Sequence, residues 1–409
     1  MLEKITLSNF RCFDTHEVKF KNLNIIVGKN NAGKSTLIEA LRLISIIVER
    51  YRTAIYRDAP NWTRMGRNYK GISPSLQSFN FTFDNICHKY SDPPAEIIAY
   101  FENGGTIEIF IHNEESIFAV LKNEKEKIIG SRSQAQNFDF PEVNTLPQIG
   151  PLLKIEDKLE SDYVKKNVSS SLSSLHFRNQ LIEFPKFFRK FKELSEKTWK
   201  GLKLDKPEYK GTILNPKVPI NLIFRDGDFS TEVGWVGQGL QMWLQTIWFL
   251  ARCHEDSTII LDEPDVYLHA DLQRKLIRIL KNKYGQIIIA THSAEIISEV
   301  DPTNVLLLDK SKNKSSFAHE YKTVQKVIEN MGSVHNLMLA RLWSAKKFII
   351  VEGKDINILK RIQDTLFPES KEPLESIPQM QCGGWSGWKF ALGTNMGFKN
   401  SVGEDIIVY

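Results

Sequence analysis

The sequence predicts an α/β fold built around a nucleotide-binding loop. Short apolar runs with the character of β-strands alternate with amphipathic helical segments along most of the chain. One of these strands, residues 25–27, leads into residues 28–35, Gly-Lys-Asn-Asn-Ala-Gly-Lys-Ser, which have the spacing of a phosphate-binding loop. A helical pattern over residues 35–50 follows at once. Because the motif requires a strand before it and a helix after it, this context favours a true nucleotide site over an ordinary turn.

The residues of this loop have separate predicted tasks. Gly28 and Gly33 let the backbone turn tightly, so that its N–H groups point toward phosphate oxygens. Lys34 can reach the β- and γ-phosphates, Ser35 can ligate Mg²⁺, and the start of the helix offers its positive dipole end to the anion. We therefore expect a nucleoside triphosphate and Mg²⁺ here. The other predicted binding residues of the loop are Asn30, Asn31 and Thr36.

Composition bounds the class of protein. A chain of 409 residues with 42% hydrophobic residues can bury the cores of two or three domains. Lys and Arg outnumber Asp and Glu by 54 to 49, a mild excess that is compatible with a polyanionic partner and equally with an ordinary soluble surface. The four cysteines form no Cys-x-x-Cys pair, so they indicate neither a zinc site nor a disulfide framework, and they fit a reducing cytoplasm. No uncharged apolar run approaches membrane length, so we expect neither a secreted nor a membrane-spanning chain.

The first third of the chain is predicted to consist mainly of strands. Residues 3–9 and 16–27 flank a turn at 11–15, and the second strand is expected to run directly into the phosphate loop. Residues 51–70 mix Arg and Lys with aromatic side chains, which fits either a surface loop anchored by Trp62 or a nucleic-acid contact. Further predicted elements are strands at 78–84 and 96–121, the latter with a hairpin at Gly104-Gly105, and a polar loop at 122–144.

The middle of the chain is predicted to be a mostly helical insertion. Within residues 170–200, four phenylalanines recur at the spacing of one helix face, Phe184, Phe187, Phe188 and Phe191. This stripe fits either a hydrophobic core or a nucleic-acid platform, and its basic outer face is a candidate for phosphate contact. The remaining predicted elements are a strand pair at 219–233, strands at 258–261, 286–290 and 305–308, a helix at 271–283, a surface loop at 309–316, helices up to 344 and a strand from Lys347.

Two strand ends supply groups for hydrolysis. The apolar strand 258–261 is followed by Asp262-Glu263, where Asp262 can hold the Mg²⁺ shell and Glu263 can polarise the attacking water. Without a positioned base, water attacks a γ-phosphate slowly. His292 follows a buried strand 30 residues beyond Asp262, and this position favours a functional histidine over a core or surface one.

The order of these motifs resembles the ABC-type ATPase head shared by SMC, Rad50 and RecF proteins. The resemblance rests on the phosphate loop, Gly237-Gln238-Gly239, Asp262-Glu263-Pro264-Asp265, Leu268-His269, Thr291-His292-Ser293 and the opening Asn9-Phe10-Arg11-Cys12-Phe13. It implies a head that dimerises around ATP, with the loop and acids from one subunit and the signature segment from the other. The roles that it implies are phosphate and Mg²⁺ binding by Lys34 and Ser35, Mg²⁺ support by Asp262, base catalysis by Glu263, γ-phosphate sensing by His292, and a place near the nucleotide for Arg11.

The signature segment departs from the family pattern. Family members usually carry a serine two residues before the signature glycine, whereas this chain has Gly237 there and keeps Gly239. The hydroxyl group that would touch the opposite γ-phosphate is therefore missing, although backbone N–H groups at the helix start can still bind phosphate. We expect slow ATP turnover. No glutamine stands out for the family's Q-loop, and Gln77 is the candidate.

A second constellation lies near the end of the sequence. Residues 346–351 form a predicted strand that leads into Glu352-Gly353-Lys354-Asp355, with a helix expected through about residue 363. This segment resembles the start of a TOPRIM domain, the metal-dependent fold of topoisomerases, primases and certain nucleases. The resemblance implies that Glu352 acts in phosphodiester chemistry and that Glu352 and Asp355 bind metal, although the second acid of related nucleases often lies at the position of Ile356. The family's Asp-x-Asp pair does not follow before Tyr409, so we expect either a fragment of a longer protein, which the apolar end favours, or an incomplete nuclease site.

An ABC-type head followed by a TOPRIM domain resembles the OLD (overcoming lysogenization defect) family, which includes the nuclease of the Gabija phage-defence system and some retron effectors. It implies a cytoplasmic, ATP- and Mg²⁺-dependent endonuclease of double-stranded DNA, assembled as a homodimer or larger homo-oligomer, with a defence-system protein or nucleic acid as partner. Two alternatives stay open, an ATPase sensor or scaffold that acts through a partner effector and a RecF-like DNA repair ATPase. The implied domains are an ATPase domain at 1–330 with an insertion at about 122–215 that is a candidate dimerisation region, a helical connector at 331–345 and the first part of a TOPRIM domain at 346–409.

Overall fold

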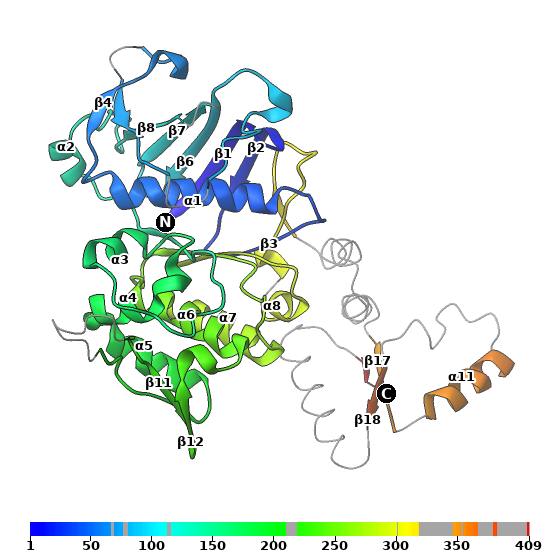
Figure 1. Cartoon of the computed structure of the whole chain (residues 1–409). Helices are drawn as coiled ribbons and strands as arrows, with labels where there is room; N and C mark the ends of the chain where they lie inside the picture. Colours follow the sequence, from blue (N-terminus) through cyan, green and yellow to red (C-terminus); the bar gives the residue numbers. More distant parts are fainter. Residues whose placement is uncertain are drawn as a thin grey trace. The chain divides into compact units, whose positions relative to one another are not determined.

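The computed structural model contains two compact units (Figure 1). The residues that it describes are 1–66, 69–76, 81–112, 116–209, 219–300, 302–318, 347–352, 355–366, 379–382 and 407–408. One unit comprises residues 1–27 and 31–316, and the other comprises 317–409 together with 28–30. None of the described helices is long and apolar enough to cross a membrane.

A six-stranded sheet organises the first unit. Its strands are β3 (Leu23–Val27), β9 (Val143–Thr145), β13 (Thr258–Asp262), β14 (Gln286–Ala290), β15 (Val305–Leu307) and β16 (Ser316–Phe317), in the order β16-β15-β3-β14-β13-β9. The pairs from β15 to β9 are all parallel. β3 and β14 are rich in branched apolar residues and are almost entirely buried, as parallel strands between two layers of helices require.

The α-helices of the first unit include one that is buried on all sides. They are α1 (Lys34–Arg50), α2 (Arg132–Gln136), α3 (Ser161–Asn167), α4 (Phe177–Glu183), α5 (Pro185–Thr198), α6 (Gln238–Arg252), α7 (Ala270–Lys283) and α8 (Ala294–Ser298). Residues 240–251 of α6 are all buried, which explains why this helix is apolar around its whole circumference. Its two tryptophans satisfy their indole N–H groups inside the core, Trp243 with Thr198 at 3.1 Å and Trp248 with Gln180 at 2.8 Å.

A second sheet is antiparallel. It contains β1 (Leu2–Phe10), β2 (Phe13–Lys19), β4 (Tyr56–Asp58), β5 (Lys70–Ile72), β6 (Ala95–Phe101), β7 (Thr106–His112) and β8 (Ser116–Lys122), in the order β2-β1-β6-β7-β8-β5-β4. The predicted hairpin at Gly104-Gly105 is confirmed, since it joins β6 to β7. The turn predicted at 11–15 is shorter, because β2 already begins at Phe13.

The single strand predicted at 16–27 is wrong. The structure divides it into β2, which pairs with β1, and β3, which lies in the parallel sheet between β14 and β15. Asn24 explains the break: its side chain accepts the N–H of Lys21 at 2.8 Å and donates to the carbonyl of Lys21 at 2.7 Å. This local hydrogen bonding turns the backbone between the two sheets.

Two further predictions need correction. Residues 81–84 form no strand, while residues 77–80 of the same predicted strand lie outside the described part. The segment 122–144, predicted as a loop, contains α2 and the start of β9. β9 has only three residues, so no periodic pattern marks it, and its pairing with β13 is made across more than a hundred residues.

The aromatic segments belong to the core. Trp62 packs against the buried cluster of Phe110, Phe118 and Val120, so the predicted anchor is present, although part of the predicted loop forms β4. The alternative of a nucleic-acid contact stays a prediction. Phe188 and Phe191 of the phenylalanine stripe are buried, and the ring of Phe191 lies 5.6 Å from that of Trp248. The stripe is therefore a packing surface between α5 and α6.

A small antiparallel sheet completes the first unit. β10 (Leu202–Leu204), β11 (Ile223–Asp226) and β12 (Phe229–Glu232) pair in that order. The predicted strand pair is thus confirmed, and its turn contains Gly227 at φ 59°, a left-handed conformation that glycine adopts without strain.

The second unit contains the predicted strand and helix near Lys347. β17 (Lys347–Glu352) is followed by α11 (Asp355–Leu366), and β17 pairs in parallel with β18 (Gln379–Cys382) and β19 (Ile407–Val408). Ile349, Val351 and Ile356 form its buried cluster. The helical connector predicted at 331–345 lies outside the described residues.

Candidate nucleotide site

The carboxyl ends of neighbouring parallel strands form the centre of the candidate site. β14 lies between β3 and β13. Lys34 begins α1 after the loop that follows β3, Asp262 ends β13, and His292 comes two residues after β14. Ligands of open α/β sheets bind outside the carboxyl ends of the strands. The fold therefore brings the predicted lysine, acid pair and histidine to one edge of the sheet.

Gly33 is required by its surroundings. Its φ of 101° is a conformation that other residues rarely adopt. A Cβ atom at this position would lie 2.5 Å from Cζ of Phe13 and 3.0 Å from Sγ of Cys12. The turn between β1 and β2 therefore packs directly on the end of the phosphate loop, which places the predicted opening motif beside the site.

Opposite charges meet around Lys34, whose side chain is buried. Burial lowers the pKa of Lys34, whereas the carboxylates of Glu263 and Asp262 act in the opposite direction. Burial also raises the pKa of Asp262, and Arg42 is the strongest influence that lowers it. Lys34 and Arg42 thus share one electrostatic environment with Asp262 and Glu263. Phosphate oxygens could take the place of the carboxylates as partners of the cations, and a divalent cation could take the place of the cations as partner of the carboxylates.

Glu263 and His292 face each other beside a strained backbone. Nε2 of His292 lies 3.9 Å from Oε1 of Glu263. Burial lowers the pKa of His292, so its imidazole is neutral at pH 7. Glu263 has φ 43°, which costs roughly 1–3 kcal/mol for a residue with a side chain. Its N–H group donates to the carbonyl of Ala290 at 2.8 Å, and this bond helps to hold the conformation.

A hydrogen-bond network joins the ends of β13 and β14. Thr291 donates to Asp265 at 2.5 Å, and the N–H of Ser293 donates to Oγ1 of Thr291 at 2.9 Å. Ser293 also donates to Gln273 of α7 at 2.5 Å. These bonds fix the positions of the residues on both sides of His292. Asp265, Thr291 and Ser293 lie within the family motifs, but no role was predicted for them or for Gln273.

A cavity of about 520 Å³ lies against the acid pair. Its walls include Asp262 and Glu263 together with Arg42 of α1 and Gln148, which follows β9. Neither Arg42 nor Gln148 was predicted as a site residue. Gln148 could be found only once β9 is known to pair with β13, and no sequence signal revealed β9. Gln77, the candidate for the Q-loop, lies outside the described residues.

The predicted signature glycines begin α6. Gly237 is the N-cap residue, with φ −58° and ψ 146°, and no atom lies within 4 Å of the place where a Cβ would be. A serine would therefore fit at Gly237 without strain. Gly239 is packed more tightly, because a Cβ there would lie 3.0 Å from the backbone oxygen of Tyr267.

A buried ion network supports the segment before α6. Arg178 of α4 donates to both carboxylate oxygens of Glu232, at 2.6 and 2.7 Å, and to Glu156 at 3.1 Å. Glu232 in turn accepts the N–H of Gly234 at 2.7 Å. From the other side, Gln241 donates to the carbonyl of Gly234 at 3.2 Å. Residues that no motif identifies therefore hold the signature segment in place.

Arg11 is bound to α1 and to the segment before β6. Its guanidinium donates to Glu39 at 2.8 Å and to the carbonyl of Thr82 at 2.6 Å. The neighbouring Cys12 lies with Sγ 3.5 Å from Oγ1 of Thr36. The turn that carries Arg11 thus lies beside the loop, and a direct contact of Arg11 with the nucleotide stays a prediction.

The predicted TOPRIM residues stand at a strand–helix junction. Glu352 ends β17, and Asp355 is the exposed first residue of α11. Among the described residues, no group of three or more His, Cys, Asp or Glu side chains could hold a metal ion. The roles of Glu352 and Asp355 therefore stay predictions.

Together these features define an α/β ATPase head of the ABC type. A parallel sheet brings lysine, acid pair and histidine together, an antiparallel sheet packs on the loop, and a buried helix begins with the signature glycines. Residues 110–298 match a family model described as "AAA domain, putative AbiEii toxin, Type IV TA system", and residues 1–50 match a second one described as "AAA domain". ATP binding follows from this class of domain.

The chain is related along most of its length to OLD nucleases, as predicted. It is 23% identical to an OLD nuclease of Thermus scotoductus, with 96% of this chain and 79% of that protein covered. It is 23% identical to the endonuclease GajA of Bacillus cereus, covering 89% of this chain and 68% of GajA. It is 22% identical to the Old nuclease of Escherichia phage P2, covering 88% of this chain and 69% of the phage protein.

Solved structures of two kinds are also similar. An SMC head bound to the C-terminal domain of ScpA from Pyrococcus furiosus gives a TM-score of 0.46 at 14% identity, covering 81% of this chain and 99% of the other. The recombination mediator RecF gives a TM-score of 0.46 at 13% identity, covering 78% of this chain and 98% of the RecF chain.

Proposed function

We propose that this chain is an ATP-hydrolysing head that controls a Mg²⁺-dependent TOPRIM DNA endonuclease in cytoplasmic defence against phage. The observation that carries the proposal is the meeting of Lys34, Asp262, Glu263 and His292 at adjacent strand ends. Similarity to OLD nucleases and to GajA supports the nuclease part. Glu352 at the end of β17 is the residue proposed for phosphodiester chemistry.

The residues of the head divide the work of hydrolysis. Lys34 and backbone N–H groups at the start of α1 hold the phosphates. Ser35 and Asp262 offer a hydroxyl and a carboxylate, oxygen ligands of the kind that Mg²⁺ prefers, and bound Mg²⁺ supplies charge neutralisation. Glu263 accepts a proton of the attacking water and orients it toward the γ-phosphate. Neutral His292 can donate to the γ-phosphate, so its hydrogen bonding changes when that phosphate leaves.

A second copy of the chain completes the site in this proposal. Trp235 and Tyr267 are large apolar side chains that are 62% and 61% exposed, and Val266 beside them is also exposed. Trp235 precedes the signature glycines, and the backbone of Tyr267 lies next to Gly239. Exposed apolar groups around a binding segment are typical of an interface. Dimerisation through this face would bring the signature helix to the nucleotide of the partner head.

Double-stranded DNA is the proposed substrate of the second unit. The parallel β17 with its following α11 gives Glu352 and Asp355 the strand-end and helix-start positions of the predicted TOPRIM motif. Asp355 is proposed as the weaker metal ligand. A defence-system protein or nucleic acid is the proposed trigger.

A sensor or scaffold without its own nuclease is the second candidate. Gly237 supports the sensor or scaffold, because the missing hydroxyl group favours slow ATP turnover. A head that hydrolyses ATP slowly stays in its ATP-bound state for a long time, which suits a sensor better than a protein that must turn over ATP rapidly. In that case cleavage would be supplied by a partner effector. A RecF-like repair ATPase would use the same head but would give Glu352 no task.

The head is tested by two substitutions with opposite expected effects. Lys34→Ala should abolish ATP binding, because it removes the cation that meets the phosphates. Glu263→Gln should keep binding but stop hydrolysis, so it should accumulate as a nucleotide-bound dimer in size-exclusion chromatography. Lys165→Ala, which removes an exposed lysine from α3, serves as the control. Equal phosphate-release rates in all four proteins would refute the assignment of the head.

The nuclease is tested by Glu352→Ala in the full-length protein. We expect loss of Mg²⁺-dependent nicking of plasmid DNA with unchanged ATP binding. Asp228→Ala, at an exposed turn of the first unit, should leave both activities intact. Undiminished nicking by Glu352→Ala would favour the sensor over the nuclease.

A further inference from the structure

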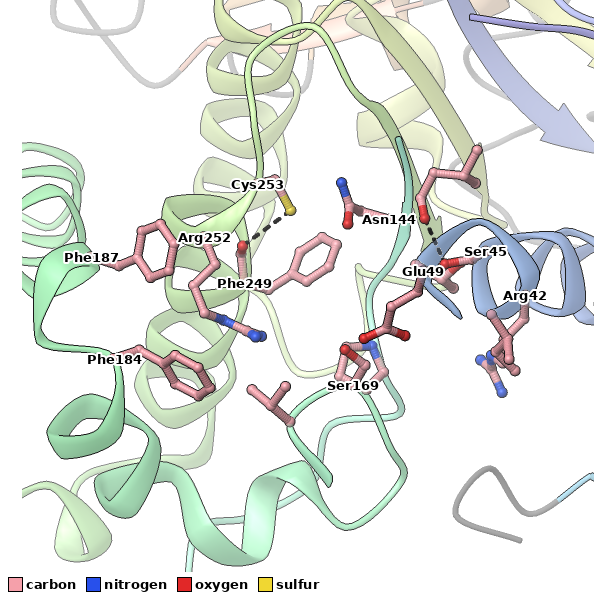
Figure 2. Close-up of a pocket in the computed structure, with 15 residues that line it drawn as sticks. Arg42, Ser45, Glu49, Asn144, Ser169, Phe184, Phe187, Phe249, Arg252 and Cys253 are labelled. Carbon is pink, nitrogen blue, oxygen red and sulfur yellow. Dashed lines mark hydrogen bonds between the residues drawn. The ribbon is translucent and has the colours of Figure 1, made fainter. Parts of the chain in front are cut away.

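A second cavity lies behind the nucleotide site. Its volume is about 240 Å³, and it is walled by α1, β9, the end of α6 and the junction of α4 and α5 (Figure 2). Three phenylalanines supply apolar surface, Phe184, Phe187 and Phe249. Small-molecule pockets commonly have volumes of about 300–1,000 Å³, so this cavity is suited to a ligand smaller than a nucleotide.

Several polar atoms in the cavity wall have no partner. Nε of Arg252, Nδ2 of Asn144 and Oγ1 of Thr145 are buried, and none makes a hydrogen bond. The hydroxyl group of the neighbouring Ser45 is satisfied, since it donates to the carbonyl of Val143 at 2.6 Å. An unsatisfied buried donor costs about 1–3 kcal/mol. A ligand with hydrogen-bond acceptors could satisfy these three atoms.

Opposite charges define the ends of this ligand. The guanidinium of Arg252 and the carboxylate of Glu49 point toward the middle of the cavity from opposite walls (Figure 2). Among the described residues neither side chain belongs to an ion pair, although burial raises the pKa of Glu49 and the charges of Arg50 and Arg252 lower it. A zwitterion can offer a carboxylate directly to Arg252 and an ammonium group directly to Glu49, which a neutral ligand cannot do. Glu49 lies at the exposed rim, so the acid end of the ligand enters first.

We propose that this cavity binds a small amino acid with an apolar or aromatic side chain. Its carboxylate accepts hydrogen bonds from Arg252, Asn144 and Thr145, and its ammonium group pairs with Glu49. The side chain packs on the phenylalanine rings. Aromatic side chains gain from such contacts beyond their buried area, which favours phenylalanine as the first probe.

The cavity shares part of its wall with the nucleotide site. Arg42 and Pro147 line both cavities. The side chain of Arg42 therefore also lines the cavity whose walls include Asp262 and Glu263. An acid bound in the second cavity attracts the Arg42 side chain toward that cavity and away from the acid pair. Occupancy should therefore change the rate of ATP hydrolysis, a step that rests on the function proposed above.

Binding is tested by titration calorimetry of the full chain with L-phenylalanine, phenethylamine and 3-phenylpropanoate. L-Phenylalanine should bind the wild type, and phenethylamine should not, because it lacks the carboxylate. Arg252→Gln should weaken binding roughly 10-fold or more, as expected for loss of a charge-assisted hydrogen bond of about 1.5–3 kcal/mol. Asn144→Asp is a second variant of nearly equal shape that should repel the carboxylate. Arg189→Gln, an exposed arginine of α5, is the matched control.

Glu49→Gln separates the two ends of the ligand. This substitution should weaken the binding of L-phenylalanine but leave the binding of 3-phenylpropanoate nearly unchanged, because 3-phenylpropanoate has no ammonium group. Absence of binding to the wild type, or equal binding by Arg252→Gln, Asn144→Asp and wild type, would overturn the site. Lys34→Ala should still bind L-phenylalanine, so failure of the ATPase assignment can be told apart from failure of this site.

The link to hydrolysis has its own measurement. Saturating L-phenylalanine should change the ATPase rate of the wild type at least twofold, and Arg42→Gln should lose this response. Binding without any change in rate would overturn the link through Arg42.

Discussion

Arg178→Gln should destabilise the ATPase head strongly, because the guanidinium of Arg178 neutralises two carboxylates inside the core. The Arg178 side chain is 0% exposed, Glu156 is buried, and Glu232 is mostly buried. All the hydrogen bonds that Arg178 donates to them, at 2.6–3.1 Å, are charge-assisted. Glutamine is neutral and shorter, so among the described side chains it leaves both Glu156 and Glu232 without a paired cation.

The expected loss in the free energy of unfolding is about 3–4 kcal/mol. Removing one partner of a buried ion pair costs about 3–5 kcal/mol, since an uncompensated charge stays inside. The cost should lie toward the lower end of this range, because Glu156 still accepts two hydrogen bonds from Asn179. The backbone N–H of Asn179 donates at 2.7 Å and its side-chain amide donates at 2.9 Å. At roughly 2 °C per kcal/mol for a unit of this size, the melting temperature should fall by about 6–8 °C.

The assay is thermal and urea unfolding of the full chain, followed by tryptophan fluorescence. Trp243 and Trp248 lie in α6, directly after the segment that Arg178 supports, so they report on this part of the head. Arg189→Gln is the control, because Arg189 is 90% exposed and pairs only with Glu193 at 3.1 Å. Its cost should be below about 0.5 kcal/mol. Equal melting temperatures of the two variants would refute the reasoning.

The same variant should show a characteristic pH dependence. Burial raises the pKa of Glu156, and Arg178 is among the groups that lower it. Without Arg178 the folded-state pKa rises further above the unfolded value, so the folded variant takes up a proton more readily than the unfolded chain. The stability deficit against the wild type should therefore shrink as the pH falls from 8 toward 5.5. A deficit that is constant over this range would mean that the lost stability comes from packing and not from charge.

Two further predictions concern the nucleotide site. Gly237→Ser should raise the free energy of unfolding by a few tenths of a kcal/mol to about 1 kcal/mol, because serine caps α6 and restricts the unfolded chain. The same substitution should raise the ATPase kcat. A lower kcat in a phosphate-release assay would contradict this expectation. Burial lowers the pKa of His292, and a protonated His292 would attract the Glu263 carboxylate that lies 3.9 Å away, so kcat/KM should fall as the pH drops below 6.5. His292→Gln should lack this limb of the pH profile. The head should also lose stability over the same range, because the unfolded chain binds the proton more tightly.

Local patterns in the sequence were sufficient for the phosphate loop and its helix. Gly33, Lys34 and the run of strand residues before them are contiguous, so motif and context lie within one short stretch. The phenylalanine stripe and the hairpin at Gly104 were likewise readable from spacing alone. Each of these features depends on residues that are near one another in the chain.

The features that escaped prediction depend on distant pairings. β9 and Gln148 acquire their positions from β13, more than a hundred residues later. Arg178 donates a hydrogen bond to Glu232, which lies 54 residues later in the chain, and no periodic pattern in the sequence relates the two residues. The division of 16–27 into two strands depends on one asparagine side chain, which a strand pattern cannot reveal. Polar interactions over long sequence separations are set by the tertiary fold, so a single sequence contains little signal for them.

The place of β3 in the sheet has a consequence for synthesis on the ribosome. Both neighbours of β3 come late in the chain, β14 at 286–290 and β15 at 305–307. At about 5–20 residues per second, roughly 15–60 s pass between the emergence of β3 and that of its partners. During this interval β3, which leads into the nucleotide loop, lacks both of its neighbours in the parallel sheet. The nascent head should therefore be unable to hold ATP until almost the whole first unit has been made, which keeps an unfinished chain from acting.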